Sequence, residues 1–362
     1  MICNIVGARP NFIKMAPLVH ALRARGLAQT LIHTGQHYDA QMSKIFFDEL
    51  NMPKPDFDLG IGSGTHAEQT ARVMLALEPV LRELKPSLVV VAGDVNSTLA
   101  AALVASKLGI PVAHVEAGLR SFDRTMPEET NRILTDHLAD FLFTTEASGS
   151  ENLVREGIAR AKIYFVGNCM IDSLDAHLPA ALARTPWKNF SLDENAYGIV
   201  TLHRPSNVDD PVALAHLVNA LAVVSERVPL LFPVHPRTQA KLQTVMPPLR
   251  RLRLTPPLGY LDFLGLVAKS RLVLTDSGGV QEETTALGVP CLTLRTSTER
   301  PVTLELGTNR LIGTDRQKII DAAALVLDSP HRQTMRPPLW DGHAGERIAA
   351  ILENAAFHGG VQ

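Results

Sequence analysis

The stretch Asp276–Glu283, with the sequence DSGGVQEE, decides how the second half of the chain folds. It follows the β-forming run Leu272–Thr275 and precedes Thr284–Leu287, so the pattern predicts a strand, a tight turn and the start of a helix. Gly278 and Gly279 carry no Cβ atom where the backbone must bend, and successive N–H groups then point outward at the positive end of the helix dipole. This geometry suits a phosphate.

Two interpretations of this turn stay open. In the first, the turn binds a phosphate, and Glu282 or Glu283, one helical turn further on, accepts hydrogen bonds from ribose hydroxyls. In the second, the turn is an ordinary connection between a strand and a helix, and Ser277 caps the helix. The rest of the chain decides between them.

The composition leaves room for two domains. The chain has 362 residues, and its 35 basic and 37 acidic side chains give a net charge of −2, which argues against nucleic acid as a partner. Cys3, Cys169 and Cys291 are odd in number, far apart and set among apolar neighbours, which indicates buried reduced thiols and a cytoplasmic location. The apolar runs have the length of strands, so we expect no membrane span.

A basic turn follows the first predicted strand. Ile2–Val6 is β-forming and helical spacing begins after Gly7–Phe12, which places Arg9 in the turn and Lys14 one turn inside the helix. Two cations beside a helix start suit an anionic ligand, because the helix dipole alone favours acids there. A solvated basic face is the alternative.

Two further predicted strands each end at a carboxylate. Leu88–Ala92 is an unbroken apolar run, typical of a parallel strand buried on both faces, and Pro111–Val115 repeats the pattern; the first strand ends at Gly93 and Asp94, and the second ends at Glu116. Open α/β sheets bind their ligands at the carboxyl edge, so we expect both acids at a site there. The alternative is that they cap the next helices. Glu128 has a similar alternative role, since it lies in the first turn of a predicted helix.

Strands alternate with helices through both halves of the chain, which predicts parallel sheets with right-handed crossovers. We expect a Rossmann-like domain at 1–167 and another at 168–342, and a last helix at 343–358 that is a candidate to pack back on the first. Leu178–Asn195 shows little periodicity and contains Pro179, so we expect an irregular connection there. The predicted fold class is α/β, with two Rossmann-like domains facing a cleft.

A second basic turn follows the first strand of the later half, where Tyr197–Leu202 ends at His203. If the two carboxyl edges share a cleft, one wall carries a nucleotide-diphosphate pocket and the other carries carboxylates, which suits a nucleotide-activated substrate. The residues expected around such a cleft are Arg9, Asp94, Glu116, His203, Ser277, Gly278 and Glu283.

Eight segments, in order and almost end to end, resemble the non-hydrolysing UDP-N-acetylglucosamine 2-epimerases. They are GARPNFIKMAPL, AGDVNSTLA, HVEAGLRS, MPEETNR, TLHRPSNVD, PVHPRT, DSGGVQEE and TERP. The resemblance implies the two-domain fold called GT-B in glycosyltransferases. It also implies reversible conversion of UDP-N-acetylglucosamine (UDP-GlcNAc) to UDP-N-acetylmannosamine (UDP-ManNAc), a precursor of surface polysaccharides, by a homodimer that needs no nicotinamide cofactor and no metal.

The same resemblance implies roles for particular residues. The implied UDP contacts are Arg9, His203, Phe263, Ser277, Gly278, Gly279, Glu283 and Arg300, with Phe263 acting through its main chain. The acids implied to act at the sugar are Asp94, Glu116 and Glu128, with Lys14 nearby. The matches to a second, allosteric substrate site are Gln36, His37 and His235.

The implied mechanism requires acids for proton transfer at C2 of the sugar. Expelling UDP across C1 and C2 leaves a 2-acetamidoglucal, so a base must remove the C2 proton from one face and a proton must return to the other. A cluster of carboxylates can serve both faces. His203 and the basic side chains would stabilise the diphosphate charge as it develops.

Other functions stay open on the sequence alone. The segments MPEETNR and TLHRPSNVD also resemble epimerases of UDP-diacetamido-uronic acids. A GT-B glycosyltransferase would share the fold but would need an acceptor site and one base. A hydrolysing epimerase would release free sugar, and a non-enzymatic protein would sense a UDP-sugar.

Overall fold

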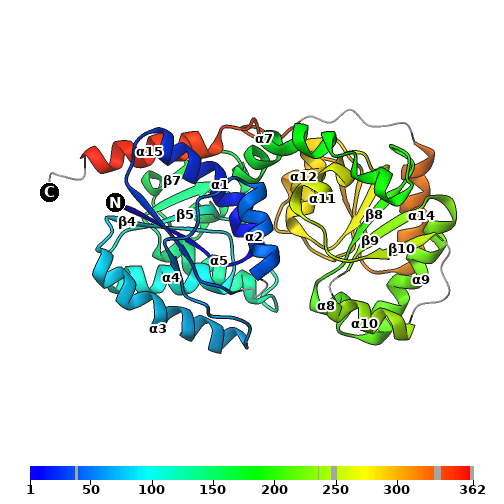
Figure 1. Ribbon diagram of the computed structural model, residues 1–362, viewed down its shortest axis with the longest axis horizontal. Helices are drawn as coiled ribbons and strands as arrows, with labels where there is room; N and C mark the ends of the chain where they lie inside the picture. The colour runs from blue at the N-terminus through cyan, green and yellow to red at the C-terminus, as the bar shows by residue number, and fades with distance from the viewer. Residues whose placement is uncertain (37–39, 235, 246–250, 330–335, 359–362) are drawn as a thin grey trace. The chain divides into compact units, whose positions relative to one another are not determined.

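The chain folds into two compact units, which are Met1–Ala176 with Pro338–Gln362 (unit 1) and His177–Pro337 (unit 2). The computed structural model describes residues 1–36, 40–234, 236–245, 251–329 and 336–358. Each unit is a parallel sheet with helices on both faces (Figure 1). None of the described helices is both long and apolar enough to cross a lipid bilayer.

Unit 1 is built on a parallel sheet with the strand order β3-β2-β1-β4-β5-β6-β7 among the described residues. The strands are β1 Ile2–Val6, β2 Gln29–His33, β3 Phe57–Asp58, β4 Leu88–Ala92, β5 Val112–Ala117, β6 Phe141–Thr144 and β7 Ile163–Phe165. Every residue of β1, β4 and β5 is buried, which explains why these strands are apolar along most of their length.

Helices cover both faces of this sheet (Figure 1). They are α1 Arg9–Ala24, α2 Ala40–Glu49, α3 His66–Leu84, α4 Asn96–Lys107, α5 Pro127–Leu138, α6 Ala147–Arg155, η1 Arg160–Lys162, the first part of α7 Cys169–Ala183, which ends in unit 2, and α15 Ala344–His358. The last of these packs closely on the first, because a Cβ atom at Gly345 would lie 2.9 Å from the backbone of Pro17. Ahead of α15, the buried Trp340 donates from Nε1 to the carbonyl of Thr145 at 2.9 Å.

Unit 2 repeats the topology with the strand order β10-β9-β8-β11-β12-β13. Its strands are β8 Gly198–Thr201, β9 Leu230–Pro233, β10 Leu252–Thr255, β11 Leu272–Thr275, β12 Cys291–Thr293 and β13 Asn309–Leu311. Its helices are η2 Pro186–Phe190, α8 Pro205–Val208, α9 Pro211–Arg227, α10 Pro236–Val245, α11 Tyr260–Ala268, α12 Gly278–Leu287, α13 Val302–Glu305 and α14 Arg316–Asp328. Alternate residues of β8 pack into two different apolar clusters, Val200 into one and Ile199 into the other.

The strand order places a topological switch point in each unit. In unit 1 the order reverses between β1 and β4, and in unit 2 between β8 and β11. Ligands of open α/β sheets bind outside the carboxyl ends of the strands at such points. The predicted α/β class with two Rossmann-like sheets is confirmed, and the common cleft stays a prediction.

One local expectation is wrong. The connection predicted at Leu178–Asn195 contains the end of α7 and the 3₁₀ helix η2, and Pro179 lies inside α7. Proline is read as a helix breaker from the sequence, although a helix can contain it at a local cost. β5 ends at Ala117, one residue beyond Glu116, where the predicted strand ends.

Candidate active site

An asparagine fixes the first turn of unit 1. Asn11 Oδ1 accepts hydrogen bonds from the backbone N–H groups of Gly7, at 3.2 Å, and Ala8, at 3.0 Å. Its Nδ2 donates to the carbonyl of Ala92 at 2.8 Å, so it joins the carboxyl ends of β1 and β4 at the switch point. Arg9 begins α1, and its side chain lies outside the described part of the structure.

Lys14 and Glu116, both predicted for the site, form a buried ion pair. Lys14 Nζ lies 2.7 Å from Glu116 Oε1, and their side chains are 6% and 3% exposed. Glu116 has a left-handed φ of 72°, beside a register shift between Val115 and Ala117. Left-handed residues other than glycine are strained, at a cost of about 1–3 kcal/mol, and they cluster at functional sites.

Asp94 is held by a guanidinium that the sequence did not single out. Asp94 Oδ2 lies 2.5 Å from Nη1 of Arg132, and Nη2 of Arg132 lies 2.7 Å from Glu129. Burial alone would raise the pKa of Glu129, but the backbone N–H of Ser121 and the guanidinium of Arg132 lower it below its ordinary value. Glu129 is therefore an ionised group that holds Arg132 against Asp94. Glu128 is its half-buried neighbour in the first turn of α5.

Asp276 organises the corresponding turn of unit 2. It is fully buried, and its carboxylate accepts backbone N–H groups of His203, at 3.1 Å, and Arg204, at 3.0 Å. His203 Nδ1 also lies 2.8 Å from Asp276 Oδ1, while 59% of the His203 side chain is exposed. Burial would raise the pKa of Asp276, but His203 and the N–H of Arg204 hold it below its ordinary value. Asp276 thus fixes an exposed imidazole at the switch point.

A buried ion network lies beside Gly278. Arg300 Nε lies 2.9 Å from Glu282 Oε1, and Arg300 Nη1 pairs with Glu299, which also lies 2.8 Å from Nη2 of Arg295. A Cβ atom at position 278 would lie 2.3 Å from Nη1 of Arg300. Gly278 does not have a positive φ, so the close approach of Arg300, rather than a bend, explains the glycine.

The remaining predicted residues of unit 2 lie on α11 and α12. Ser277 precedes α12, and in the described structure its side chain makes no capping hydrogen bond, which counts against the simple capping role. Gly279, next to Gly278, is half-buried. Burial and the neighbouring Glu282 raise the pKa of Glu283 to about 8, so this carboxyl is protonated at neutral pH. The side chain of Phe263 packs against the apolar cluster on its face of the sheet, so it contributes to the core of unit 2.

Of the three residues matched to an allosteric site, the structure describes Gln36. Its Oε1 accepts from the backbone N–H of Ser97 at 3.0 Å and from the Ser97 hydroxyl at 2.7 Å. Its carbonyl accepts from Gln69 Nε2 at 3.1 Å. The amide oxygen of Gln36 is therefore engaged inside unit 1. His37 and His235 lie outside the described residues.

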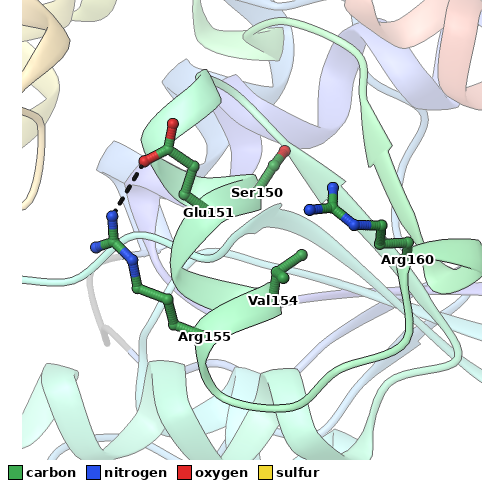
Figure 2. A pocket seen from close by; sticks show the side chains of 5 residues that line it. All are labelled: Ser150, Glu151, Val154, Arg155 and Arg160. Carbon is green, nitrogen blue, oxygen red and sulfur yellow. Dashed lines mark hydrogen bonds and ion pairs between the residues drawn. The ribbon is translucent and has the colours of Figure 1, made fainter.

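A hollow of about 250 Å³ lies on unit 1 and is lined by Ser150, Glu151, Val154, Arg155 and Arg160 (Figure 2). Glu151 and Arg155 pair across one helical turn at 3.3 Å, and both are exposed. Exposed pairs of this kind contribute little energy. None of the predicted site residues lines the hollow, so we assign it no role.

The fold and the charged turns define a doubly wound α/β protein with acid–cation pairs at one switch point and a fixed histidine at the other. The family model described as UDP-N-acetylglucosamine 2-epimerase matches residues 20–353. The UDP-N-acetylglucosamine 2-epimerase of Methanocaldococcus jannaschii is 45% identical over 359 residues, which cover 96% of this chain and 97% of that protein. The UDP-2,3-diacetamido-2,3-dideoxy-D-glucuronate 2-epimerase of Pseudomonas aeruginosa is 45% identical over 355 residues, covering 97% and 99%.

A solved structure gives the same result. The crystal structure of the M. jannaschii UDP-GlcNAc 2-epimerase in complex with UDP-GlcNAc and UDP has a TM-score of 0.92 and 44% identity, covering 98% of this chain and 99% of that one. The chain belongs to the UDP-N-acetylglucosamine 2-epimerase family. The predicted family and the predicted enzyme class, an isomerase, are thereby confirmed.

Proposed function

We propose that the protein interconverts UDP-GlcNAc and UDP-ManNAc by epimerisation at C2. The observation that carries this proposal is the pairing of two acids with two cations at the switch point of unit 1, Glu116 with Lys14 and Asp94 with Arg132. A glycosyltransferase needs one base, whereas an epimerase must handle protons on both faces of C2. The 45% identical M. jannaschii relative carries the name of this activity.

The reaction proceeds by elimination and re-addition. A carboxylate removes the C2 proton, the electrons of the C2–H bond form a C1=C2 double bond, and the C1–O bond to UDP breaks. The intermediate is a 2-acetamidoglucal. A proton then reaches the opposite face of C2, and a UDP oxygen forms a new bond to C1. Asp94, Glu116 and Glu128 are the acids for these transfers, with Lys14 holding Glu116 in place.

Unit 2 binds the nucleotide in this proposal. The start of α12 presents backbone N–H groups to the diphosphate, and Arg300, His203 and Arg9 neutralise its charge as UDP leaves. Glu283, protonated at neutral pH, both donates to and accepts from the ribose hydroxyls. The other residues assigned to UDP are Ser277, Gly278, Gly279 and the main chain of Phe263.

A second candidate substrate is a UDP-diacetamido-uronic acid. The P. aeruginosa enzyme named for such a sugar is as similar to this chain, at 45%, as the enzyme named for UDP-GlcNAc. The chemistry at C2 is the same for both sugars, because each carries an acetamido group there. The choice between the two sugars depends on the residues around C3 and C6 of the bound sugar.

Incubation of the purified protein with UDP-GlcNAc in deuterated water tests the activity. Epimerisation predicts UDP-ManNAc with deuterium at C2, and a parallel incubation with UDP-2,3-diacetamido-2,3-dideoxyglucuronate decides the sugar. Free ManNAc with UDP as the main products would indicate a hydrolysing enzyme. The protein would instead be a sensor of a UDP-sugar if it turned over neither sugar but bound UDP, and if Asp94→Asn behaved like the wild type in both measurements.

We further propose a cytoplasmic homodimer that supplies surface polysaccharide synthesis and binds a second substrate molecule at Gln36, His37 and His235. The three buried thiols, Cys3, Cys169 and Cys291, fit a reducing compartment. Sedimentation equilibrium tests the dimer. Rate curves against UDP-GlcNAc concentration test the second site, since activation by substrate gives a sigmoidal curve that Gln36→Ala should flatten.

A further inference from the structure

We propose that His114 is a positioning residue, a buried imidazolium that fixes the two turns carrying Asp94 and Glu116. His114 is fully buried on β5. Its Nε2 lies 2.8 Å from the carbonyl of Gly93, and its Nδ1 lies 2.6 Å from Oδ1 of Asp136. A carbonyl oxygen only accepts hydrogen bonds, so Nε2 must carry a proton.

The surroundings of Asp136 decide the other nitrogen. Asp136 Oδ2 accepts the backbone N–H of Gly118 at 3.1 Å and lies 2.7 Å from Nη2 of Arg120. Both of these partners donate to Asp136, and the guanidinium is permanently charged, so the group is a carboxylate. A carboxylate only accepts hydrogen bonds, so Nδ1 also carries a proton and the ring is an imidazolium.

The neighbouring charges favour the same state. Arg120 Nη2 lies 2.7 Å from Asp136 and also 2.7 Å from Glu156, whose side chain is 27% exposed, so Asp136 shares its guanidinium with a second carboxylate. A charged His114 gives the fully buried Asp136 a second cation.

Both fixed groups belong to the acid-bearing turns. Gly93 immediately precedes Asp94, and a Cβ atom on Gly93 would lie 3.1 Å from Lys14 Nζ and 3.9 Å from Glu116 Oε1. Gly118 follows Glu116 by two residues, and it has a left-handed φ of 80°. One ring thus holds the carbonyl before the first acid and, through Asp136, the N–H after the second.

The proposal rests on the proposed function for its kinetic test, which compares His114→Asn, Asp136→Asn and Val112→Ala. Displacing a reacting group by about 1 Å can cost about 100-fold, so the first two variants should lower kcat by about that factor. Their KM and UDP affinity should change less than about threefold, because the nucleotide residues other than Arg9 belong to unit 2. Val112→Ala is the matched control, since it opens a cavity at the amino end of β5 and should lower Tm with kcat changed less than about twofold.

Nitrogen NMR of histidine-labelled protein supplies a readout that does not depend on turnover. The His114 signals are assigned as those that disappear in His114→Asn. If that variant does not fold, they are assigned as those that shift in Asp136→Asn. Both ring nitrogens should carry protons, because each of them faces a hydrogen-bond acceptor. A neutral ring, or a kcat loss in the variants no larger than in Val112→Ala, overturns the proposal. An inactive wild type with a charged His114 would instead refute the proposed function.

Discussion

The ammonium of Lys14 and the carboxylate of Glu116 lie 2.7 Å apart, although 102 residues separate them in the chain. Both side chains are almost completely buried. Two charges withdrawn from water stabilise each other, so the loss of either partner removes compensation from the charge that stays buried. The pair therefore links α1 to the irregular end of β5. The stability of this region depends on the same ion pair that holds Glu116.

Lys14→Met should remove this compensation. We expect the free energy of unfolding to fall by about 3 to 5 kcal/mol, the cost typical of breaking a buried pair from one side. Turnover should be lost, because Glu116 loses the group that holds it. Urea unfolding and C2 deuterium uptake measure the two effects. Lys14→Arg keeps the charge, so a stability loss as large as that of Lys14→Met would show that the charge is not what matters.

Gly278→Ala should weaken UDP binding. The added methyl would lie 2.3 Å from Arg300 Nη1, so the guanidinium must leave its place between Glu282 and Glu299. Loss of about 1.4 kcal/mol of binding energy corresponds to a tenfold weaker Kd, and we expect at least about this change by calorimetry. Val280→Ala in the same helix controls for a general disturbance of α12. Equal Kd values for wild type and Gly278→Ala would show that UDP binding does not depend on the close approach of Arg300 to position 278.

Glu283 should make stability depend on pH. Its pKa is raised to about 8 by burial and by Glu282, from 4.5 in the unfolded chain. A raised carboxyl pKa contributes stability that is complete below the unfolded value and is lost as pH rises to the folded value. The free energy of unfolding should therefore fall between about pH 5 and pH 8, by up to about 1.4 kcal/mol per pH unit. Glu283→Gln should lack this slope, and parallel curves for the two proteins would exclude Glu283 as the group.

Trp340→Phe should destabilise unit 1. The indole N–H donates to the carbonyl of Thr145 at 2.9 Å, and the ring is 1% exposed. Phenylalanine fills most of the space but leaves a buried carbonyl without this donor, which costs about 1–3 kcal/mol. Trp187→Phe in unit 2 is the matched control for aromatic volume. Thermal unfolding measures both, and an unchanged Tm in Trp340→Phe would show that the hydrogen bond contributes nothing.

Much of the fold could be predicted because it depends on local patterns. Unbroken apolar runs such as Leu88–Ala92 identify strands buried on both faces, and DSGGVQEE identifies the turn after β11. α7 was not predictable in the same way. Its Pro179 is a breaker on local grounds, and the helix forms in spite of it.

The partners of the site residues could not be predicted, because they come from distant parts of the chain. Arg132 meets Asp94 across 38 residues, and Asp276 meets His203 across 73. Asn11, Arg132 and Asp276 all lie inside the quoted segments, so the signal that could have found them was their place beside predicted residues. Their roles as holders of those residues depend on distances that only the fold creates.

The close packing of α15 on α1 affects how the chain can fold during synthesis. Unit 2 is translated between two portions of unit 1, so the first sheet emerges from the ribosome long before the helix that covers α1. Until then the apolar flank of α1 is open to chaperones or to wrong partners. Unit 1 therefore completes its fold only after α15 has been translated. A nascent chain that stops before α15 exposes apolar surface of an incomplete domain.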